Sequence, residues 1–291
     1  MKRIVCIDCG ASSTKWTLQS ADGNLISGSA SFLTGHIFDE KEWQRVTKVL
    51  QGVNKEVGPV DEVVMGVTGL DGSDKVSKEL HLLIGSVFDS ESVKLMNDMQ
   101  LAYSAFLAPG EGVFVYGGTG SVAASIDKDG NFHRSGGWGY LIADEGGGFW
   151  IGQQALKHVT RQWDSGEFDW SDPLVSLTMK HANSKNWDEL RAYVYSGGRH
   201  VVASLAPVVA EAKALGSREA EAILLQAGKE LAKLARELQR RVKAEKFVAM
   251  GGVFKVDSSI FQSLVDELPS KIELVDSDIS RAWLSRNINR G

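Results

Sequence analysis

The sequence predicts an α/β protein of two similar domains, and three observations carry this prediction. Apolar, strand-like segments alternate with helix-like segments, a pattern typical of mainly parallel sheets with right-handed crossovers. A β-hairpin unit with a glycine-rich turn occurs twice. The dipeptide Pro109-Gly110 interrupts the chain just before the second copy. We therefore expect one domain over residues 1–110 and another over residues 111–291, with a helical insertion in the second and a last helix that could pack back on the first.

The composition is that of a globular protein large enough to bury a core. Its 291 residues are 43% hydrophobic and 24% charged, and the formal net charge is −5. This acidic balance disfavours a nucleic-acid partner held by a basic surface. No stretch approaches the roughly 18 apolar residues of a membrane helix, and the N-terminus lacks a signal-peptide pattern. We expect a cytoplasmic protein without membrane or nucleic-acid partners.

The repeated unit has the order strand, glycine-rich turn, strand, hairpin turn, strand. In the first copy the opening strand runs into the turn 10–15, and the hairpin turn contains Asp22. In the second copy the strand 111–116 runs into the turn 117–121, and the hairpin turn contains Asp129. The offset that separates the two aspartates also carries the first glycine-rich turn onto the second. Two copies in register indicate two similar domains that face each other.

Two cysteines, Cys6 and Cys9, lie in the first strand and raise the question of a redox or zinc motif. A zinc site needs about four ligands, and no second pair of cysteines follows. A redox C-x-x-C usually opens a helix, whereas this pair lies in a β-branched run. Residues three apart in a strand point to opposite faces, so the thiols should diverge. We favour two small buried side chains over a redox or metal site.

Each glycine-rich turn has the chemistry of a phosphate-binding loop. Glycines let backbone N–H groups approach an anion, and Ser and Thr hydroxyls add donors. The G-x-x-x-x-G-K-[ST] pattern of a Walker A loop is absent. A single turn of this kind is more often a simple hairpin. Two in register, one headed by Asp8 and the other reading GTGS, favour a phosphate clamp.

Residues 134–152 combine glycines, tryptophans and carboxylates. The alternative to a binding site is a flexible loop, but such loops rarely carry bulky aromatic residues among the glycines. The face of Trp138 suits the C–H face of a sugar, and Asp144 and Glu145 suit its hydroxyls. The run from Gly148 onward is expected to start a helix.

Strands and helices can be expected elsewhere in the chain. Asp39 and Glu42 have the spacing of a capping box before a helix with buried positions at spacings of three and four. Residues 203–246 are helical by the same periodicity. Three apolar strands, with the residues that follow them, are 63–67 with Thr68, 92–96 with Asn97 and Asp98, and 247–250 with Gly251 and Gly252.

These motifs together resemble the N-acetylglucosamine kinase and BadF/BadG-type ATPase family, within the actin/hexokinase-like superfamily. The resemblance covers nearly the whole chain in order. It implies two ribonuclease-H-like domains with a nucleotide cleft between them, ATP and Mg²⁺ as cofactors, and a homodimer. The segments that carry it are DxGxSSTK at 8–15, ND at 97–98, GGTGS at 117–121, GGWGYLIADEGGGFWIG at 136–152 and MGGVF at 250–254.

The resemblance also assigns roles to the cofactor-binding residues. It implies that Asp8 would hold Mg²⁺ through water. Gly251 and Gly252 would lie against the adenosine. The phosphates would contact the first turn through Gly10, Ser12, Ser13, Thr14 and Lys15, and the second turn through Gly118, Thr119, Gly120 and Ser121.

Asp98 matches the catalytic base of the family, and one carboxylate that takes the hydroxyl proton is what phosphoryl transfer needs beyond positioning. The alternative for Asp98 is a helix cap. Asp71 is unusual for the family and could meet an amine. The substrate-binding residues implied by the resemblance are His36, Thr68, Asp71, Asn97, Thr119, Gly137, Trp138, Asp144 and Glu145.

Two departures from the family pattern stand out. Gly35 takes the place of an asparagine that could bond a sugar hydroxyl. The C-terminal segment 276–284 reads DSDISRAWL where relatives have a Pro-x-x-Gly-Ala-Ala helix. A C-terminal helix is still expected here, but contacts from it to adenine are not.

The leading hypothesis is an ATP-dependent kinase that transfers the γ-phosphate to a hydroxyl of N-acetylglucosamine, glucosamine or a close relative. The first alternative is an activator-type ATPase, which needs cysteines for a shared iron–sulfur cluster. The second is a non-catalytic sugar or nucleotide sensor. Such sensors usually add a DNA-binding domain, for which we expect no room here, and Asp98 favours catalysis.

Overall fold

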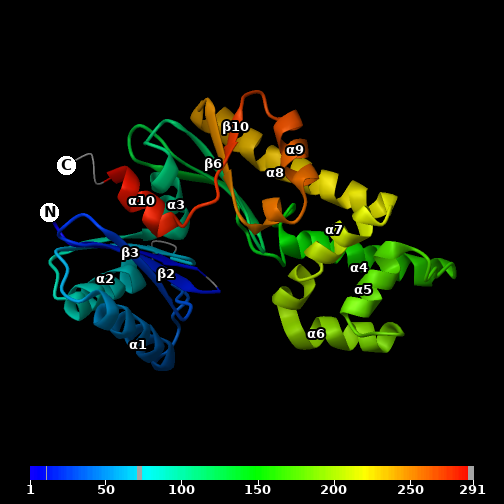
Figure 1. Ribbon diagram of the computed structural model, residues 1–291, viewed down its shortest axis with the longest axis horizontal. Helices are drawn as coiled ribbons and strands as arrows, with labels where there is room; N and C mark the ends of the chain where they lie inside the picture. Colours follow the sequence, from blue (N-terminus) through cyan, green and yellow to red (C-terminus); the bar gives the residue numbers. More distant parts are fainter. Residues whose placement is uncertain (11, 71–73, 288–291) are drawn as a thin grey trace. The chain divides into compact units, whose positions relative to one another are not determined.

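The computed structural model describes residues 1–10, 12–70 and 74–287 (Figure 1). The chain divides into two compact units, Met1–Pro109 with Ser277–Gly291, and Gly110–Asp276. We expected the boundary after residue 110; the first unit ends at Pro109, and the C-terminal segment Ser277–Gly291 belongs with it. Each unit contains one five-stranded sheet.

The first unit has a mixed sheet in the order β3-β2-β1-β4-β5. The strands β1, β2 and β3 form an antiparallel meander, and β4 and β5 run parallel to β1. The two parallel crossovers each contain a helix, as the alternation of strands and helices predicted. The strands are β1 (Ile4–Cys9), β2 (Thr14–Gln19), β3 (Leu25–Ala30), β4 (Glu62–Val67) and β5 (Ser92–Asn97).

Helices cover both faces of this first sheet. On one face α1 (Glu40–Val57) packs beside α2 (Asp74–Phe88). On the other face α3 (Asp98–Phe106) packs beside α10 (Ile279–Asn287), which contacts β1 and β2 (Figure 1). Side chains alternate along β1, so Val5, Ile7 and Cys9 join the core under α1 and α2. Cys6 and Asp8 therefore lie on the α3 and α10 face.

The start of α1 follows the prediction with one difference. Asp39 is the N-cap, and its carboxylate accepts from the Glu42 backbone N–H at 2.9 Å. The Glu42 carboxylate accepts from the Phe38 N–H rather than from the N-cap residue as in a capping box. The buried stripe of Val46, Leu50 and Val53 then holds the helix on the sheet.

The second unit repeats the strand order of the first. Its sheet is β10-β9-β6-β7-β8, with β7 and β8 antiparallel to β6 in a meander and β9 and β10 parallel to it. The offset that separates Asp22 from Asp129 carries β2 onto β7 without a shift. The repeat is confirmed. The strands are β6 (Gly112–Gly117), β7 (Ser121–Ile126), β8 (Phe132–Gly136), β9 (Lys246–Met250) and β10 (Ile272–Leu274).

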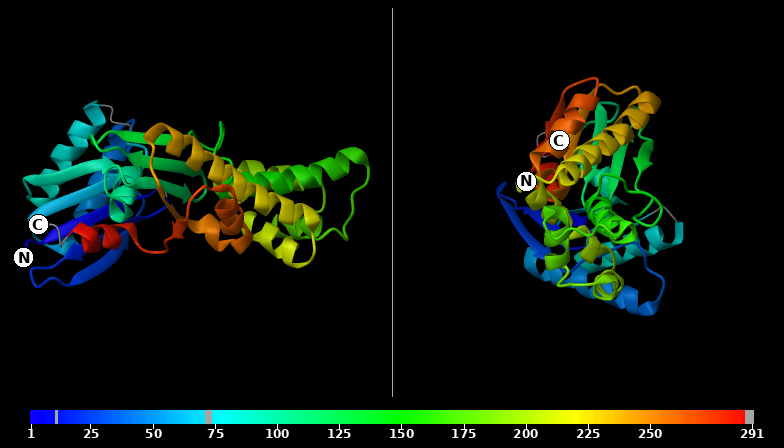
Figure 2. Two further views of the ribbon diagram at one scale, coloured as in Figure 1. Left: turned by 90° about the horizontal axis from the view of Figure 1, so that it is seen from above. Right: turned by 90° about the vertical axis from the view of Figure 1, so that its right-hand side faces the viewer.

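The helices of the second unit fall into two groups. The long α8 lies along β6, β7 and β8 with α9 beside it (Figure 2). The helices α4 to α7 lie between β8 and α8 in the sequence; a helical insertion was expected in this domain without a position. Their bounds are α4 (Gly148–Ser165), α5 (Pro173–His181), α6 (Trp187–Ala203), α7 (Ala206–Ala214), α8 (Arg218–Val242), the 3₁₀ turn η1 (Gly252–Lys255) and α9 (Ser258–Glu267).

Helix length and polarity also bear on membrane insertion. Among the described residues, no helix combines the length and the apolar character that crossing a bilayer would require.

Candidate active site

The parallel strands of the first sheet end in register at one edge. Cys9 in β1 pairs with Val67 in β4, and Val67 pairs with Asn97 in β5. The residues that follow are Gly10, Thr68 and Asp98, and the Thr68 N–H donates to the Cys9 carbonyl at 2.9 Å. This carboxyl edge is where open α/β sheets place their ligands.

Asp98 is the first residue of α3, and the cap of that helix is Asn97. The Asn97 side chain accepts from the Gln100 N–H, and the Gln100 side chain accepts from the Asn97 N–H. The Asp98 carboxylate accepts from the Met99 N–H at 2.9 Å and from the Thr68 hydroxyl. Burial raises the pKa of Asp98, and these two hydrogen bonds act against the rise.

Asp8 lies on β1 at the same edge, and its environment disfavours the charged form. Burial, followed by the charges of Asp98 and Asp278, raises the pKa of Asp8 from 3.8 to about 7, and Lys15 opposes the rise. Three carboxylates therefore face one partly buried region with one lysine. Such a region attracts a cation.

The first glycine-rich turn connects β1 to β2. The Gly10 N–H donates to the Ser13 carbonyl at 3.0 Å, which closes the turn. Ser12 and Ser13 are exposed, while Thr14 is fully buried within β2. Lys15 lies directly opposite Asp8 in the sheet and makes an ion pair with Asp278, with 3.7 Å between Nζ and Oδ2.

The loop after β3 approaches this edge from the side. The Gly35 N–H donates to the Thr68 carbonyl at 2.8 Å. The ring of His36 lies on Gly69, where a β-carbon would stand 2.5 Å from the His36 Nε2. His36 is exposed and stands beside the Thr68 strand end. Asp71, predicted to bind substrate, lies outside the described residues.

In the second unit, the GTGS turn is held by the start of α4. The Gly148 N–H donates to the Gly118 carbonyl at 2.8 Å, and the Phe149 N–H donates to the Thr119 carbonyl at 2.9 Å. The Ser121 hydroxyl donates to the Glu145 carbonyl at 2.7 Å. The turn and the DEGGG segment thus form one structure, although they lie well apart in the sequence.

The Asp144 side chain packs against the GTGS turn at Gly120. A β-carbon on Gly120 would stand 2.2 Å from the Asp144 Oδ2, so only glycine fits beneath the carboxylate. The other oxygen accepts from the Gly139 N–H at 3.2 Å, and Asp144 itself has a φ of 73°. Burial raises the pKa of Asp144, Glu145 adds to the rise, and Gly139 and Arg199 oppose it.

Two further predicted residues of the second unit lie near the GTGS turn. The Gly137 N–H donates to the Ser121 carbonyl at 2.9 Å. Trp138 is 60% exposed, and the Arg134 guanidinium lies 4.8 Å from its ring centroid. Glu145 is exposed beside Asp144. The aromatic face and both carboxylates are therefore within one segment of the unit.

The strand β9 ends against the strand β6. Gly251 has a φ of 127°, and a β-carbon there would stand 2.1 Å from the Gly117 carbonyl oxygen. Gly252 is exposed and starts η1. Gly251 thus needs glycine for its backbone conformation and for close packing on the second turn.

The predicted residues therefore gather into two groups, one in each unit. The first unit brings together Asp8, Lys15, Thr68 and Asp98 with the first turn. The second unit brings the GTGS turn together with the Trp138 to Glu145 segment and Gly251. Sequence reasoning missed Asp278 and Arg199. The sequence did contain one signal for Asp278, since an aspartate directly before a predicted helix is a typical N-cap. In the structure its carboxylate accepts from the Ser280 hydroxyl and the Arg281 N–H.

The carboxylates at the first edge suit Mg²⁺ as ligands. The acidic groups at the first edge are oxygen donors, which Mg²⁺ prefers, and the charges of Asp98 and Asp278 disfavour the charged form of Asp8. Within residues 1–10, 12–70 and 74–287, no three His, Cys, Asp or Glu side chains form a ready metal cage. Oxygen donors of this kind fit an ion that arrives with substrate phosphates and uses one or two carboxylates.

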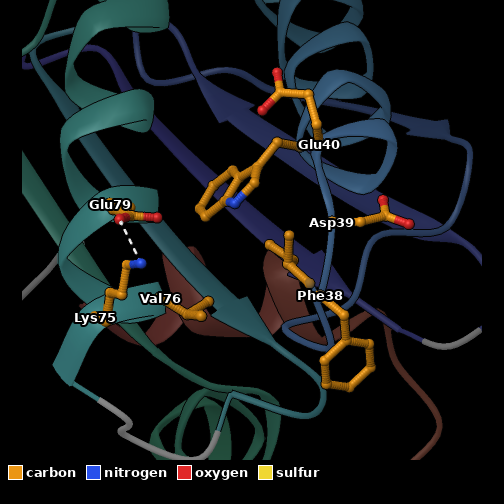
Figure 3. A pocket seen from close by; sticks show the side chains of 8 residues that line it. Phe38, Asp39, Glu40, Lys75, Val76 and Glu79 are labelled. Atoms are coloured by element: carbon orange, nitrogen blue, oxygen red, sulfur yellow. Dashed lines mark ion pairs between the residues drawn. The ribbon is translucent and has the colours of Figure 1, made fainter.

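A surface pocket of about 310 Å³ lies elsewhere in the first unit, between the starts of α1 and α2 (Figure 3). Its described lining includes none of the predicted site residues. Lys75 and Glu79 form an exposed ion pair at its rim, with 4.0 Å between the charged atoms. The lining residues are Ile37, Phe38, Asp39, Glu40, Trp43, Lys75, Val76 and Glu79.

Comparisons with known proteins agree with the family predicted from the motifs. An N-acetylmuramic acid/N-acetylglucosamine kinase of Clostridium acetobutylicum is 28% identical over 242 residues, which is 79% of this chain and 77% of that protein. An N-acetyl-D-glucosamine kinase of Dictyostelium discoideum is 30% identical over 208 residues, which is 67% of this chain and 62% of that protein. Both relatives are named as sugar kinases, which supports the predicted class of enzyme.

A solved structure supports the fold. The crystal structure of a candidate N-acetylglucosamine kinase of Chromobacterium violaceum matches with a TM-score of 0.72 and 24% identity, over 98% of each chain. The predicted α/β class with two similar domains is confirmed. The family model of the BadF/BadG/BcrA/BcrD ATPases matches residues 5–280, so the chain belongs to the BadF/BadG/BcrA/BcrD ATPase family.

Proposed function

We propose that this protein is an ATP-dependent kinase that phosphorylates a hydroxyl of an amino sugar such as N-acetylglucosamine, glucosamine or N-acetylmuramic acid. One observation carries the proposal: Asp98 stands at the carboxyl end of β5, in register with the glycine-rich turn after β1. A carboxylate and a phosphate-binding turn on one sheet edge are the two parts that phosphoryl transfer needs. The names of the curated relatives support the substrate class.

Asp98 acts as the general base in this proposal. Its carboxylate takes the proton of the sugar hydroxyl while the hydroxyl oxygen bonds to the γ-phosphorus and ADP leaves with the electrons of the broken P–O bond. Hydrogen bonds from Thr68 and Met99 orient the carboxylate. Burial that raises its pKa also makes it a stronger base toward the hydroxyl.

The two turns bind the phosphates. Backbone N–H groups and hydroxyls of the first turn, with the Lys15 ammonium, contact the β- and γ-phosphates. The GTGS turn, fixed by the start of α4, adds donors from the second unit. Gly251 and Gly252 line the adenosine site. When bound, Mg²⁺ near Asp8 supplies positive charge that neutralises the phosphate oxygens.

The segment from Trp138 to Glu145 binds the sugar in this proposal. The exposed face of Trp138 packs on sugar C–H groups, and Arg134 behind the ring holds its orientation. Asp144 and Glu145 accept hydroxyl hydrogen bonds. A free amine at position 2 of the sugar would add a charge-assisted bond to a carboxylate of this segment. The neutral acetamide of an N-acetyl sugar could donate its N–H to the carboxylate but would form no ion pair.

The test is ADP release from the purified protein with ATP and Mg²⁺ across N-acetylglucosamine, glucosamine, N-acetylmannosamine, N-acetylmuramic acid and glucose. We expect turnover that depends on one of the amino sugars. Asp98→Asn should lower kcat by about 10² to 10⁴, the range for removing a general base. Asp22→Asn is the matched control, since Asp22 lies in the distant β2–β3 hairpin, and it should leave turnover unchanged.

Two outcomes would contradict the proposal. Turnover without any sugar would favour the activator-type ATPase. Such an ATPase needs surface cysteines for an iron–sulfur cluster shared between subunits, whereas Cys6 and Cys9 are both fully buried in β1. Nucleotide and sugar binding without turnover would favour a sensor. The homodimer stays a prediction, which light scattering of the full chain would check.

A further inference from the structure

The last helix brings a carboxylate to the first glycine-rich turn. The helix α10 packs on β1, β2 and α3 of the first unit. A buried hydrogen bond of 2.8 Å joins the Ser280 and Thr17 hydroxyls, and Arg286 donates to the Phe106 carbonyl at 2.7 Å. These two contacts fix both ends of the helix. Asp278, just before α10, therefore has a defined place on the sheet.

The two oxygens of the Asp278 carboxylate make different contacts. Its Oδ1 accepts from the Ser280 hydroxyl and from the Arg281 N–H, as an N-cap does. Its Oδ2 faces the Lys15 Nζ at 3.7 Å. The cap thus orients the carboxylate, and the other oxygen meets the lysine.

Lys15 has two carboxylates within its reach. Asp8 is its direct cross-strand neighbour, on the same face of the sheet. Within the described part of the chain, however, the ion pair of Lys15 is with Asp278 and not with Asp8. Asp278 thus holds the ammonium on the side of α10. The Asp8 carboxylate, only partly buried, is left open to another cation.

We propose that Asp278 is a positioning residue that holds Lys15 away from Asp8, so that Asp8 stays available to the Mg²⁺ of a bound nucleotide. This inference rests on the proposed function for the identity of the ligand. Without the charge of Asp278, the nearest carboxylate for Lys15 is Asp8, and opposite charges a few ångströms apart in a partly buried region attract strongly. Lys15 and Mg²⁺ would then compete for one carboxylate.

The variant Asp278→Asn tests this proposal, because asparagine keeps the N-cap but removes the charge. We expect the Mg²⁺ concentration for half-maximal binding of a fluorescent ADP analogue to rise about tenfold, with the KM for sugar unchanged. Arg286→Ala is the control for docking of α10, because it removes the bond to the Phe106 carbonyl and leaves the hydrogen bonds of Asp278 in place. It should lower the melting temperature and leave the Mg²⁺ dependence as in the wild type.

The double variant shows whether Asp278 acts through Lys15. Lys15→Met should weaken nucleotide binding, and Asp278→Asn should add no further change in Mg²⁺ dependence when Lys15 is absent. The inference is overturned if Asp278→Asn leaves the Mg²⁺ dependence unchanged, or if its tenfold effect persists in the Lys15→Met background.

The same measurements separate this inference from the proposed function. A wild-type protein that binds the Mg²⁺-dependent nucleotide but transfers no phosphate to a sugar overturns the proposed function alone, since the binding assay still decides the role of Asp278. A wild-type protein that binds no nucleotide at any Mg²⁺ concentration overturns both.

Discussion

Neighbouring residues at the end of β5 have separate tasks. Asn97 caps α3 through a reciprocal pair of hydrogen bonds with Gln100, which frees Asp98 from that task. The Asp98 carboxylate instead bonds to Thr68 and Met99 at the edge of the sheet. Asn97 thus provides the N-cap of α3, while the Asp98 carboxylate accepts from one N–H of the first turn and keeps its bond to Thr68 at the edge of the sheet.

Asp8 makes the stability of the protein depend on pH. Its folded-state pKa is raised from 3.8 to about 7, so between these values the folded state holds a proton that the unfolded state has released. The free energy of unfolding should then fall as pH rises from about 4 to 7 and level off above. The loss is at most on the order of 4 kcal/mol. Urea unfolding from pH 5 to 8 in EDTA measures it.

Asp8→Asn is the control for this prediction. Asparagine does not titrate, so the variant should lose the part of the pH slope that Asp8 causes and should be more stable than the wild type at pH 8. Asp98 and Asp144 have pKa values raised in the same direction, so some slope should remain. An unchanged slope in Asp8→Asn would contradict the shifted pKa.

At the scale of elements, the second turn and the segment before α4 act together. Gly120→Ala should destabilise the protein by about 1 to 3 kcal/mol, because its β-carbon would fall 2.2 Å from the Asp144 Oδ2 and Asp144 is held by Gly139. In an Asp144→Gly background most of this cost should disappear, since the obstructing side chain is gone. Urea denaturation of both single variants and the double variant measures the coupling.

Gly52→Ala is the matched control for the effect of the added methyl group. Gly52 lies in α1, and a β-carbon there meets nothing within 4 Å. This variant should be neutral or stabilising by up to about 1 kcal/mol, since alanine favours a helix. A Gly120→Ala cost that persists in full without Asp144 would show that the turn itself, and not the carboxylate, excludes a side chain.

Local elements were predictable from the sequence because their causes are local. The Asp39 cap, the hairpin turns and the alternation of β1 depend on a few neighbouring residues. The lock between the GTGS turn and Asp144 was not predictable in the same way. It depends on a positive φ at a non-glycine residue and on backbone hydrogen bonds to the start of α4, neither of which leaves a pattern in the sequence.

At the scale of the whole molecule, the duplication predicted the matching strand orders of the two sheets. The duplication did not predict the position of the charged cluster of Asp8, Lys15 and Asp278. The offset between the two copies carries Asp8 onto the fully buried Val115, and Lys15 onto Val122, so the charged group is confined to the first copy. Its second carboxylate, Asp278, comes from the other end of the chain. The last helix was expected to be able to pack on the first domain, but the pairing of Asp278 with Lys15 there is seen only in the fold.

The connection between the units allows a prediction about motion. The chain passes from one unit to the other after Pro109 and again after Asp276, so two short connections join two separately packed bodies. Sugar kinases of two domains can close around their substrates by bending at such connections. We expect the radius of gyration in solution X-ray scattering to decrease when an amino sugar and a non-hydrolysable ATP analogue are added together, and to change less with either alone.

Asp98→Asn, which should still bind both ligands, is the control for closure without turnover. A radius of gyration that stays constant in the wild type under saturating ligands would contradict this prediction of a closing motion.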